Sequence, residues 1–335
     1  MTNNTTVAVL GAGSWGTALA IQLARNGLQV NLWGHRAKHI EGLIAARENI
    51  PYLPGIALSE NIRPDASLEN CLQNAEVVLI AIPSKAFRSL LQSLKPGLDQ
   101  GVSVYWASKG FEIESGKLLH EIFCEELPGH HYGVISGPTF ASEVASGLPA
   151  AITCAGDEQS STKHFANLLH GNRFRCYTSD DVVGVELGGA LKNILAIAVG
   201  TADGLGFGAN TRAALITRGL AEEIRLGQRL GARQETLMGL AGLGDLVLTC
   251  TDDQSRNRRF GLAIGRGISV QQAEIEIGQT VEGLRAAKAI HHLALDLKLD
   301  LPIMEQVYQV LYQDKPPLDA VKDLESRPQR AELGD

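Results

Sequence analysis

A glycine-rich turn near the N-terminus has the spacing of a nucleotide-binding loop. Gly11, Gly13 and Gly16 stand in the segment GAGSWG, directly after the apolar residues 6–10. In such a turn the first glycine permits a tight bend, the second lets backbone N–H groups approach a pyrophosphate, and the third lets the next helix pack on the strand. Because that helix N-terminus carries partial positive charge, the turn predicts a dinucleotide site. A glycine-rich turn without a ligand is the alternative.

Two polar residues, His35 and Arg36, follow the second predicted strand at residues 29–33. At this position an NAD-selective site carries an Asp or Glu that binds the ribose 2′-hydroxyl, and none is present here. A guanidinium can instead pair with the 2′-phosphate of NADP. We therefore expect that NADP(H) is preferred and that NAD(H) is possible. A solvated turn arginine is the alternative.

Lys192 lies in the most apolar helical pattern of the chain. Ten of the fifteen residues at 185–199 are apolar, and only Lys192 and Asn193 interrupt the middle. Burial of an unpaired ammonium is costly and lowers its pKa, which makes a lysine a usable proton donor and acceptor near neutral pH. The alternative is a lysine whose stem is buried while its ammonium reaches water.

Lys109 and the segment SGPTFA at 136–141 each follow a predicted strand, at residues 102–107 and 132–136. A doubly wound sheet binds ligands beyond the carboxyl ends of its strands, so both are placed to reach a cleft. The turn at 136–141 also offers backbone N–H groups and a hydroxyl. For Lys109 an ordinary surface position is the alternative.

The densest basic cluster of the chain follows Ser255, in the run SRNRR. Ser255 can cap a helix that begins at Arg256, and Arg256 and Asn257 then lie beside the exposed N–H groups of its first turn. This combination suits a phosphate group. A merely solvated helix start is the alternative.

Composition limits the classes of protein to which this chain can belong. The net charge of −7 argues against a broad basic face for nucleic acid. The five cysteines are scattered without CxxC spacing, so we expect structural thiols and no metal site. No apolar run of about 18 residues is evident, and the N-terminus lacks the pattern of a signal peptide. We therefore expect a cytoplasmic protein with no integral membrane segment.

The elements that must position these residues form two parts. Residues 1–180 alternate strand and helix, which predicts an α/β dinucleotide-binding domain with a Rossmann-like, doubly wound parallel sheet. Residues 181–335 are predicted to form an all-helical domain that binds substrate and carries catalysis. The expected strands are residues 6–10, 29–33, 77–82, 102–107, 132–136, 151–154 and 174–178.

These segments together resemble the bacterial NAD(P)-dependent sn-glycerol-3-phosphate dehydrogenases. The resemblance runs from Val7 to about Arg327 and includes GAGSWGTALA, ASKGFE, SGPTFASEV, ELGGALKNILAIAVG, GLGDLVLTC, SRNRRFG and VEG. Seven matching segments in order are far more specific than one glycine turn. The resemblance implies an oxidoreductase that reduces dihydroxyacetone phosphate to sn-glycerol 3-phosphate and supplies glycerophospholipid synthesis.

The resemblance also implies roles for individual residues. It makes Lys192 the catalytic proton donor and acceptor. The residues that it implies around the substrate are Lys109, Gly137, Thr139, Lys192, Asp245, Ser255, Arg256 and Asn257. The residues that it implies for the cofactor are Gly11, Gly13, Ser14, Trp15, Gly16, His35, Arg36, Lys109, Ala141, Arg256 and Glu282. His35 departs from the usual polar residue of the family, and Thr280 leaves the contacts at the adenosine end undefined.

In the implied mechanism Lys192 protonates the carbonyl oxygen while hydride reaches C2 of dihydroxyacetone phosphate. Lys109 helps to polarise that oxygen, Asp245 holds Lys192 or a substrate hydroxyl, and the helix start at Arg256 and Asn257 grips the phosphate. Two other hypotheses remain: a different β-hydroxyacid-type dehydrogenase, and a non-catalytic NADP(H) sensor. We also expect a homodimer that forms through the helical domain.

Overall fold

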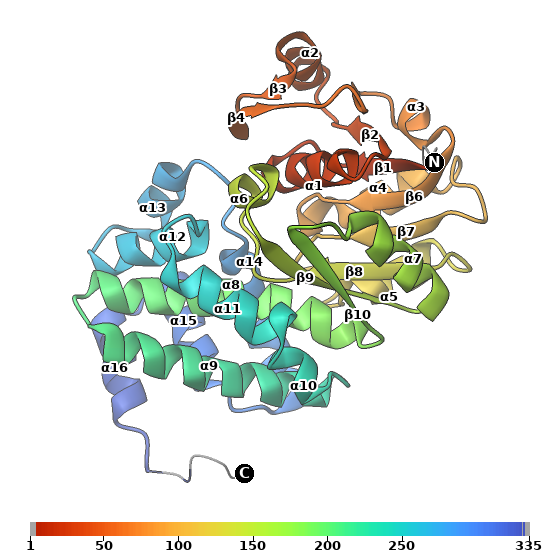
Figure 1. Ribbon diagram of the computed structural model, residues 1–335. Helices are drawn as coiled ribbons and strands as arrows, with labels where there is room; N and C mark the ends of the chain where they lie inside the picture. Colours follow the sequence, from red (N-terminus) through yellow and green to blue (C-terminus); the bar gives the residue numbers. More distant parts are fainter. Residues whose placement is uncertain (1–4, 330, 332–335) are drawn as a thin grey trace.

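A single eight-stranded sheet organises the N-terminal half in the computed structural model, which describes residues 5–329 and 331 (Figure 1). Residues 1–4, where the sequence shows no signal-peptide pattern, lie outside the described residues. The strand order is β10-β9-β8-β7-β6-β1-β2-β5. The strands are β1 (Thr6–Leu10), β2 (Gln29–Trp33), β5 (Ile62–Asp65), β6 (Ala75–Ile80), β7 (Ser103–Trp106), β8 (Tyr132–Ser136), β9 (Ala150–Gly156) and β10 (Phe174–Ser179).

Strand β1 shows why this half is a three-layer α/β structure. Val7 and Val9 join the hydrophobic cluster on one face of the sheet, whereas Ala8 and Leu10 join the cluster on the other. All four are fully buried. Helices cover both faces, as a mostly parallel sheet requires: α1 (Ser14–Arg25), α2 (Ala37–Ala46), α3 (Leu68–Leu72), α4 (Phe87–Leu94), α5 (Leu119–Glu126), α6 (Ala141–Ala145) and α7 (Gln159–Leu169).

The predicted doubly wound parallel sheet is confirmed, with an exception at one pair of strands. Strands β8 and β9 are antiparallel, and the other pairs of this sheet among the described residues are parallel. The connection between β8 and β9 contains only the five-residue helix α6. Five helical residues span about 7.5 Å, less than half the length of a typical strand. That helix cannot return the chain to the starting edge for a parallel crossover.

Three short strands were absent from the expectation. Strand β5 is an edge strand with the sequence IRPD, and its proline is tolerated because an edge strand leaves some N–H groups unpaired. Strands β3 (Glu48–Asn49) and β4 (Leu53–Ala57) form a separate two-stranded sheet beyond α2. None of the three has the apolar alternation that would reveal a strand in the sequence.

Helix α8 (Val182–Gly204) is the axis of the helical half, and it lies along the β8–β10 side of the sheet (Figure 1). It is 23 residues long, longer than the expected residues 185–199. By length and composition it could cross a membrane, which corrects the expectation that no such run exists. Because 89% of its apolar window is buried inside the protein, it has the burial of a core helix.

The other helices of this half surround α8. Glycines on both helices let α12 pack closely against α8. A Cβ at Gly200 of α8 would lie 2.2 Å from the Arg258 carbonyl oxygen, and a Cβ at Gly261 of α12 would lie 2.2 Å from the Ile197 carbonyl oxygen. These helices are α9 (Ala209–Arg229), α10 (Gln234–Leu237), α11 (Asp245–Thr251), α12 (Arg256–Gly265), α13 (Val270–Ile277), α14 (Glu282–Leu297), α15 (Pro302–Tyr312) and α16 (Pro317–Glu325).

Candidate active site

Two lysines converge on one buried carboxylate where the sheet meets the helical half. Lys109 Nζ donates to Asp245 Oδ2 at 2.6 Å, and Lys192 Nζ donates to Asp245 Oδ1. Asp245 is fully buried, and the Lys192 side chain is 10% exposed. Both lysine alternatives are therefore excluded: Lys192 does not extend to water, and Lys109 is not an ordinary surface lysine.

Neighbouring residues fix this arrangement. Asp245 is the first residue of α11, and the Thr249 hydroxyl donates to its carbonyl oxygen at 2.6 Å. Gly189 leaves room for Lys109, because a Cβ there would lie 3.3 Å from Lys109 Cδ. The same absent Cβ would lie 2.8 Å from Ser136 Oγ, a buried hydroxyl without a hydrogen-bond partner among the described residues. Ser136 is therefore a buried polar group beside Lys109 whose hydrogen-bonding capacity is unused.

Burial gives Lys192 the protonation behaviour of an acid–base group. Loss of hydration lowers the pKa of its ammonium to about 8, an effect that Asp245 opposes and Lys109 reinforces. At neutral pH the ammonium is the main form, and a modest rise in pH yields the free amine. Lys192 can therefore donate a proton in one direction of a reaction and accept it in the other.

Glu282 and Arg256 lie on the same side of this cluster. Burial raises the pKa of Glu282, and the opposing positive charges are those of Arg256, Lys109 and Lys192, in that order. Arg256 is exposed and donates to Gln279 Oε1 at 3.2 Å. The first turns of α12 and α14 therefore come together beside the lysines, although they are 26 positions apart in the chain.

The helix start at Ser255 has the predicted cap but uses Asn257 differently from the expectation. Ser255 Oγ accepts from Arg258 N at 3.2 Å. The Asn257 side chain donates to Asn193 Oδ1 and accepts from Gly283 N, both at 2.9 Å, and so joins α12 to α8 and α14. What this helix start offers a phosphate is the N–H groups of its first turn, which have no partner within the helix.

The glycine turn has the geometry that its spacing predicts. A Cβ at Gly11 would lie 2.3 Å from the Ala81 carbonyl oxygen, and one at Gly16 would lie 1.8 Å from that of Gly11. By contrast, a Cβ at Gly13 would meet nothing within 4 Å. Helix α1 begins at Ser14, followed by Trp15, with no side-chain cap. Its first N–H groups therefore face open space into which a pyrophosphate fits.

The residues expected at the ribose lie at the far end of β2. His35 and Arg36 are both exposed there. Arg36 donates to the Tyr52 hydroxyl, and its guanidinium lies 5.9 Å from the centre of the Tyr52 ring. Both of these contacts of Arg36 are with the uncharged Tyr52, so they leave its positive charge unneutralised.

The turn after β8 brings the remaining predicted residues to the carboxyl edge of the sheet. Gly137 is required there, because a Cβ would lie 2.8 Å from Ile152 Cα. Thr139 Oγ1 donates to the Gly137 carbonyl oxygen at 3.2 Å, and Ala141 begins α6. This turn lies next to α11, since Pro138 is the nearest side chain to a Cβ built at Gly244.

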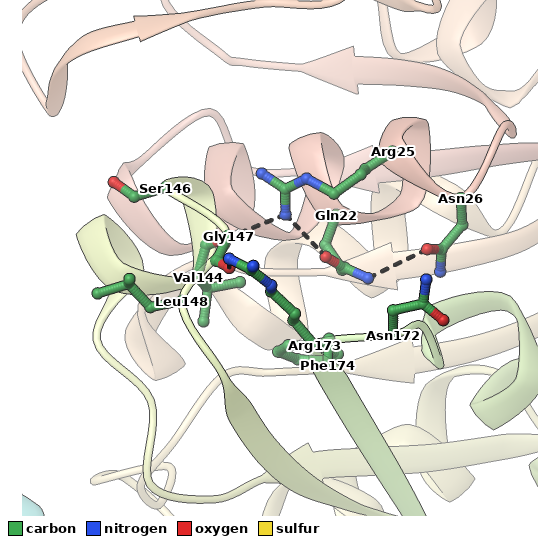
Figure 2. Close-up of a pocket in the computed structure, with 10 residues that line it drawn as sticks. All are labelled: Gln22, Arg25, Asn26, Val144, Ser146, Gly147, Leu148, Asn172, Arg173 and Phe174. Atoms are coloured by element: carbon green, nitrogen blue, oxygen red, sulfur yellow. Dashed lines mark hydrogen bonds between the residues drawn. The ribbon is translucent and has the colours of Figure 1, made fainter.

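A cavity that the site does not use lies elsewhere, at the C-terminal end of α1 (Figure 2). It encloses about 400 Å³, and Arg25 and Arg173 extend along its walls. Arg25 is already satisfied by the carbonyl oxygens of Val144 and Ala145 and by Gln22 Oε1. The cavity is therefore a seam between α1 and α6, and no acid–base pair lines it.

Fold and site together define a class of protein. A glycine turn with the spacing of a dinucleotide-binding loop opens the doubly wound sheet, and a buried lysine–aspartate–lysine cluster lies beyond the carboxyl ends of the same strands. This combination is that of a dinucleotide-dependent oxidoreductase. No group of three or more His, Cys, Asp or Glu side chains in the described part of the chain could hold a metal ion.

Comparisons with known proteins identify the family. Residues 6–162 and 181–322 match the N-terminal and C-terminal models of NAD-dependent glycerol-3-phosphate dehydrogenase. The chain is 53% identical to the glycerol-3-phosphate dehydrogenase [NAD(P)+] of Psychromonas ingrahamii, over 98% of each chain. The chain belongs to the NAD-dependent glycerol-3-phosphate dehydrogenase family. It is an NAD(P)-dependent oxidoreductase that interconverts dihydroxyacetone phosphate and sn-glycerol 3-phosphate.

Solved structures resemble this chain to different degrees. The crystal structure of glycerol-3-phosphate dehydrogenase from Coxiella burnetii matches with a TM-score of 0.94 at 46% identity, over 97% of this chain and 99% of that chain. A ketopantoate reductase from Ralstonia eutropha matches with a TM-score of 0.58 at 17% identity, over 95% of this chain and all of that chain. That likeness shows only that the two share a fold.

Proposed function

We propose that Lys192 is the acid–base residue of the reaction. Its ammonium is buried and donates one N–H to Asp245, which fixes its position and leaves two further N–H donors for a substrate. In the reducing direction Lys192 gives that proton to the carbonyl oxygen at C2, and in the oxidising direction the free amine removes it. The observation that carries this proposal is the pairing of Lys192 and Lys109 with the two oxygens of Asp245.

Lys109 keeps positive charge beside the oxygen that becomes negative. Because one buried carboxylate partners two ammonium groups, the cluster has an excess positive charge in a water-poor cleft. That charge stabilises a developing alkoxide. The start of α12 at Arg256 and Asn257, together with the turn at Gly137 and Thr139, orients the phosphate end of the substrate.

The residues of the sheet half fit a bound NADP(H). The turn at Gly11, Gly13 and Gly16 holds the pyrophosphate, and Arg36 pairs with the 2′-phosphate, which favours NADPH over NADH. The remaining residues on the cofactor side are Ser14, Trp15, His35, Lys109, Ala141, Arg256 and Glu282. When bound, the nicotinamide ring supplies the hydride.

The decisive experiment replaces Lys192 with methionine, which has a similar length and no charge. We expect kcat for reduction of dihydroxyacetone phosphate to fall about a thousandfold, within the range attributed to a positioned proton donor. NADPH binding, measured by fluorescence titration, should stay within about twofold of the wild type because the glycine turn is untouched. Near-normal turnover in this variant would disprove the assignment.

Several wider features of the protein follow as part of the same proposal. NADPH as reductant favours synthesis of glycerol 3-phosphate for phospholipids by a cytoplasmic homodimer. Light scattering of the purified protein tests the dimer. Turnover with dihydroxyacetone phosphate distinguishes the enzyme from an NADP(H) sensor.

A further inference from the structure

Glu223 is a buried carboxyl group that no hydrogen bond satisfies. It lies on α9 and is 0% exposed. Neither of its carboxyl oxygens has a hydrogen-bond partner among the described residues. A buried carboxylate without a partner is strongly unfavourable, so burial raises the pKa of Glu223 well above its usual value. In the folded protein near neutral pH, such a carboxyl group keeps its proton and is uncharged.

The packing of α9 on α8 brings Glu223 to the catalytic lysine. The two helices are antiparallel neighbours joined by a short connection, and a Cβ at Gly219 would lie 2.6 Å from a Leu195 methyl group. One helical turn further along α9 is Glu223, and three residues back along α8 is Lys192. Residues four apart lie on one face of a helix, as do residues three apart, so Glu223 comes level with Lys192.

The charges around Glu223 belong to the active-site cluster. Its ionisation is disfavoured by Asp245 and favoured by Lys192, and the buried Cys250 thiol of α11 is close enough for its own pKa to be raised by Glu223. On α10, the other helix packed here, Glu235 is exposed. Among the described residues, the charges that act on Glu223 are therefore those of Asp245 and Lys192.

The adjacent Glu222 is also buried, and burial raises its pKa to about 7, but its carboxylate has hydrogen-bond partners. Glu222 points away from the cluster and accepts from Ile303 N at 2.7 Å and from Met304 N at 3.1 Å, where it caps α15. It thus has a structural role and satisfied hydrogen bonds. Glu223, one residue later, has neither.

We propose that Glu223 is a positioning residue that determines how far into the alkaline range Lys192 keeps its proton. As the neutral acid it leaves the Lys192 ammonium readily able to donate. When it loses its proton to water at higher pH, its negative charge stabilises the ammonium and extends reduction to more alkaline pH. Because Glu223 is fully buried, it acts through Lys192 and not through direct contact with a ligand. This inference rests on the proposed role of Lys192.

The test is the pH profile of the Glu223→Gln variant, which keeps the shape of the side chain but cannot ionise. We expect kcat for dihydroxyacetone phosphate reduction at saturating NADPH to stay within about twofold of the wild type on the acidic plateau. The alkaline limb should move about one unit toward lower pH, so activity on that limb falls about tenfold. Glu223→Met should move the limb in the same direction. Normalised profiles that superimpose on the wild type would overturn the proposal.

Glu222→Gln is the matched control, because it removes a buried carboxylate one residue away that faces α15. It should lower the melting temperature and leave the alkaline limb in place. An equal shift of the limb in this variant would contradict a specific role for Glu223. An infrared difference spectrum between neutral and alkaline pH should contain a carboxylic-acid band that Glu223→Gln lacks, and the absence of that band from the wild type would also overturn the proposal.

The two proposals fail in different ways. If Lys192 is not the proton donor, Lys192→Met retains turnover, whatever the profile of Glu223→Gln. If only the inference about Glu223 is wrong, Lys192→Met is inactive and Glu223→Gln has the wild-type profile.

Discussion

The two halves of the active site differ in what they offer a ligand: the sheet half offers backbone groups, and the helical half offers charged side chains. At the glycine turn, backbone N–H groups and open space are offered to the ligand, and the important property of Gly11, Gly13 and Gly16 is the lack of a side chain. At the helical half, Lys192, Asp245 and their neighbours offer buried charge. The first region should therefore be sensitive to one added methyl group, and the second to one lost charge.

The largest effect should come from Asp245→Asn, which removes the carboxylate that holds both lysines. Without Asp245 the pKa of Lys192 should fall further, because that carboxylate opposes the effect of burial. Much of Lys192 would then be the neutral amine at neutral pH and unable to donate. We expect kcat for reduction to fall about a thousandfold.

Stability should also fall, by about 3–5 kcal/mol, because the removal of one partner leaves buried charge uncompensated. Steady-state kinetics and thermal unfolding measure the two effects separately. NADPH affinity serves as the control, and it should change little. A loss of less than tenfold in kcat would show that the carboxylate does not organise the lysines.

An added methyl group in the glycine turn should produce the next largest effect, and its position should determine its nature. In Gly16→Ala the new Cβ would lie 1.8 Å from the Gly11 carbonyl oxygen, so the turn must shift. We expect NADPH affinity to fall about a hundredfold, with a lower melting temperature.

Gly13→Ala is the matched variant, since its Cβ would meet nothing within 4 Å. Its melting temperature should match the wild type, while NADPH affinity falls about tenfold because the methyl group occupies the approach of the pyrophosphate. Fluorescence titration and calorimetry measure both. Wild-type NADPH affinity in Gly13→Ala would mean that the pyrophosphate lies elsewhere.

Arg36→Ala tests the side-chain charge that is assigned to the 2′-phosphate of the cofactor. Arg36 is exposed, so salt screens its interaction with a phosphate. We expect KM for NADPH to rise about tenfold and KM for NADH to stay unchanged. Lys38→Ala removes an exposed charge two residues away and is the control. Equal changes in KM for both cofactors would argue against a contact with the 2′-phosphate.

The sequence was sufficient to predict the features that are local in the chain. The glycine turn, its strand and its helix are consecutive, and the Ser255 cap acts within its own helix turn. A strand was expected at residues 151–154, but the antiparallel direction of β9 was not. Strand direction depends on the connection through α6, and the alternation of apolar residues does not encode direction.

The resemblance already implied that Asp245 holds Lys192 or a substrate hydroxyl, and the structure has the contact with Lys192, but the second contact of Asp245, with Lys109, could not be read from the sequence. Lys109 and Asp245 are 136 positions apart, and only the packing of sheet on helices brings them together. Gly189 and Glu223 were missed for the same reason. Gly189 looks like an ordinary helix glycine, and Glu223 stands in a charged stretch of α9 beside Glu222 without any local sign of burial.

The smallest expected effect is the pH response of the unaltered enzyme between about pH 7 and pH 8, where the chemistry of the helical half can be separated from binding by the sheet half. Because the pKa of Lys192 is lowered to about 8, its ammonium still predominates at pH 7 and becomes the minor form above pH 8. Reduction of dihydroxyacetone phosphate should therefore decrease by no more than about twofold over this unit and decline further at higher pH. Oxidation of glycerol 3-phosphate, which needs the free amine, should rise over the same range.

NADPH affinity should not follow this titration, since no described contact of the glycine turn involves Lys192. If affinity and kcat shared one midpoint, the two regions would be electrostatically coupled and the division between them would be wrong.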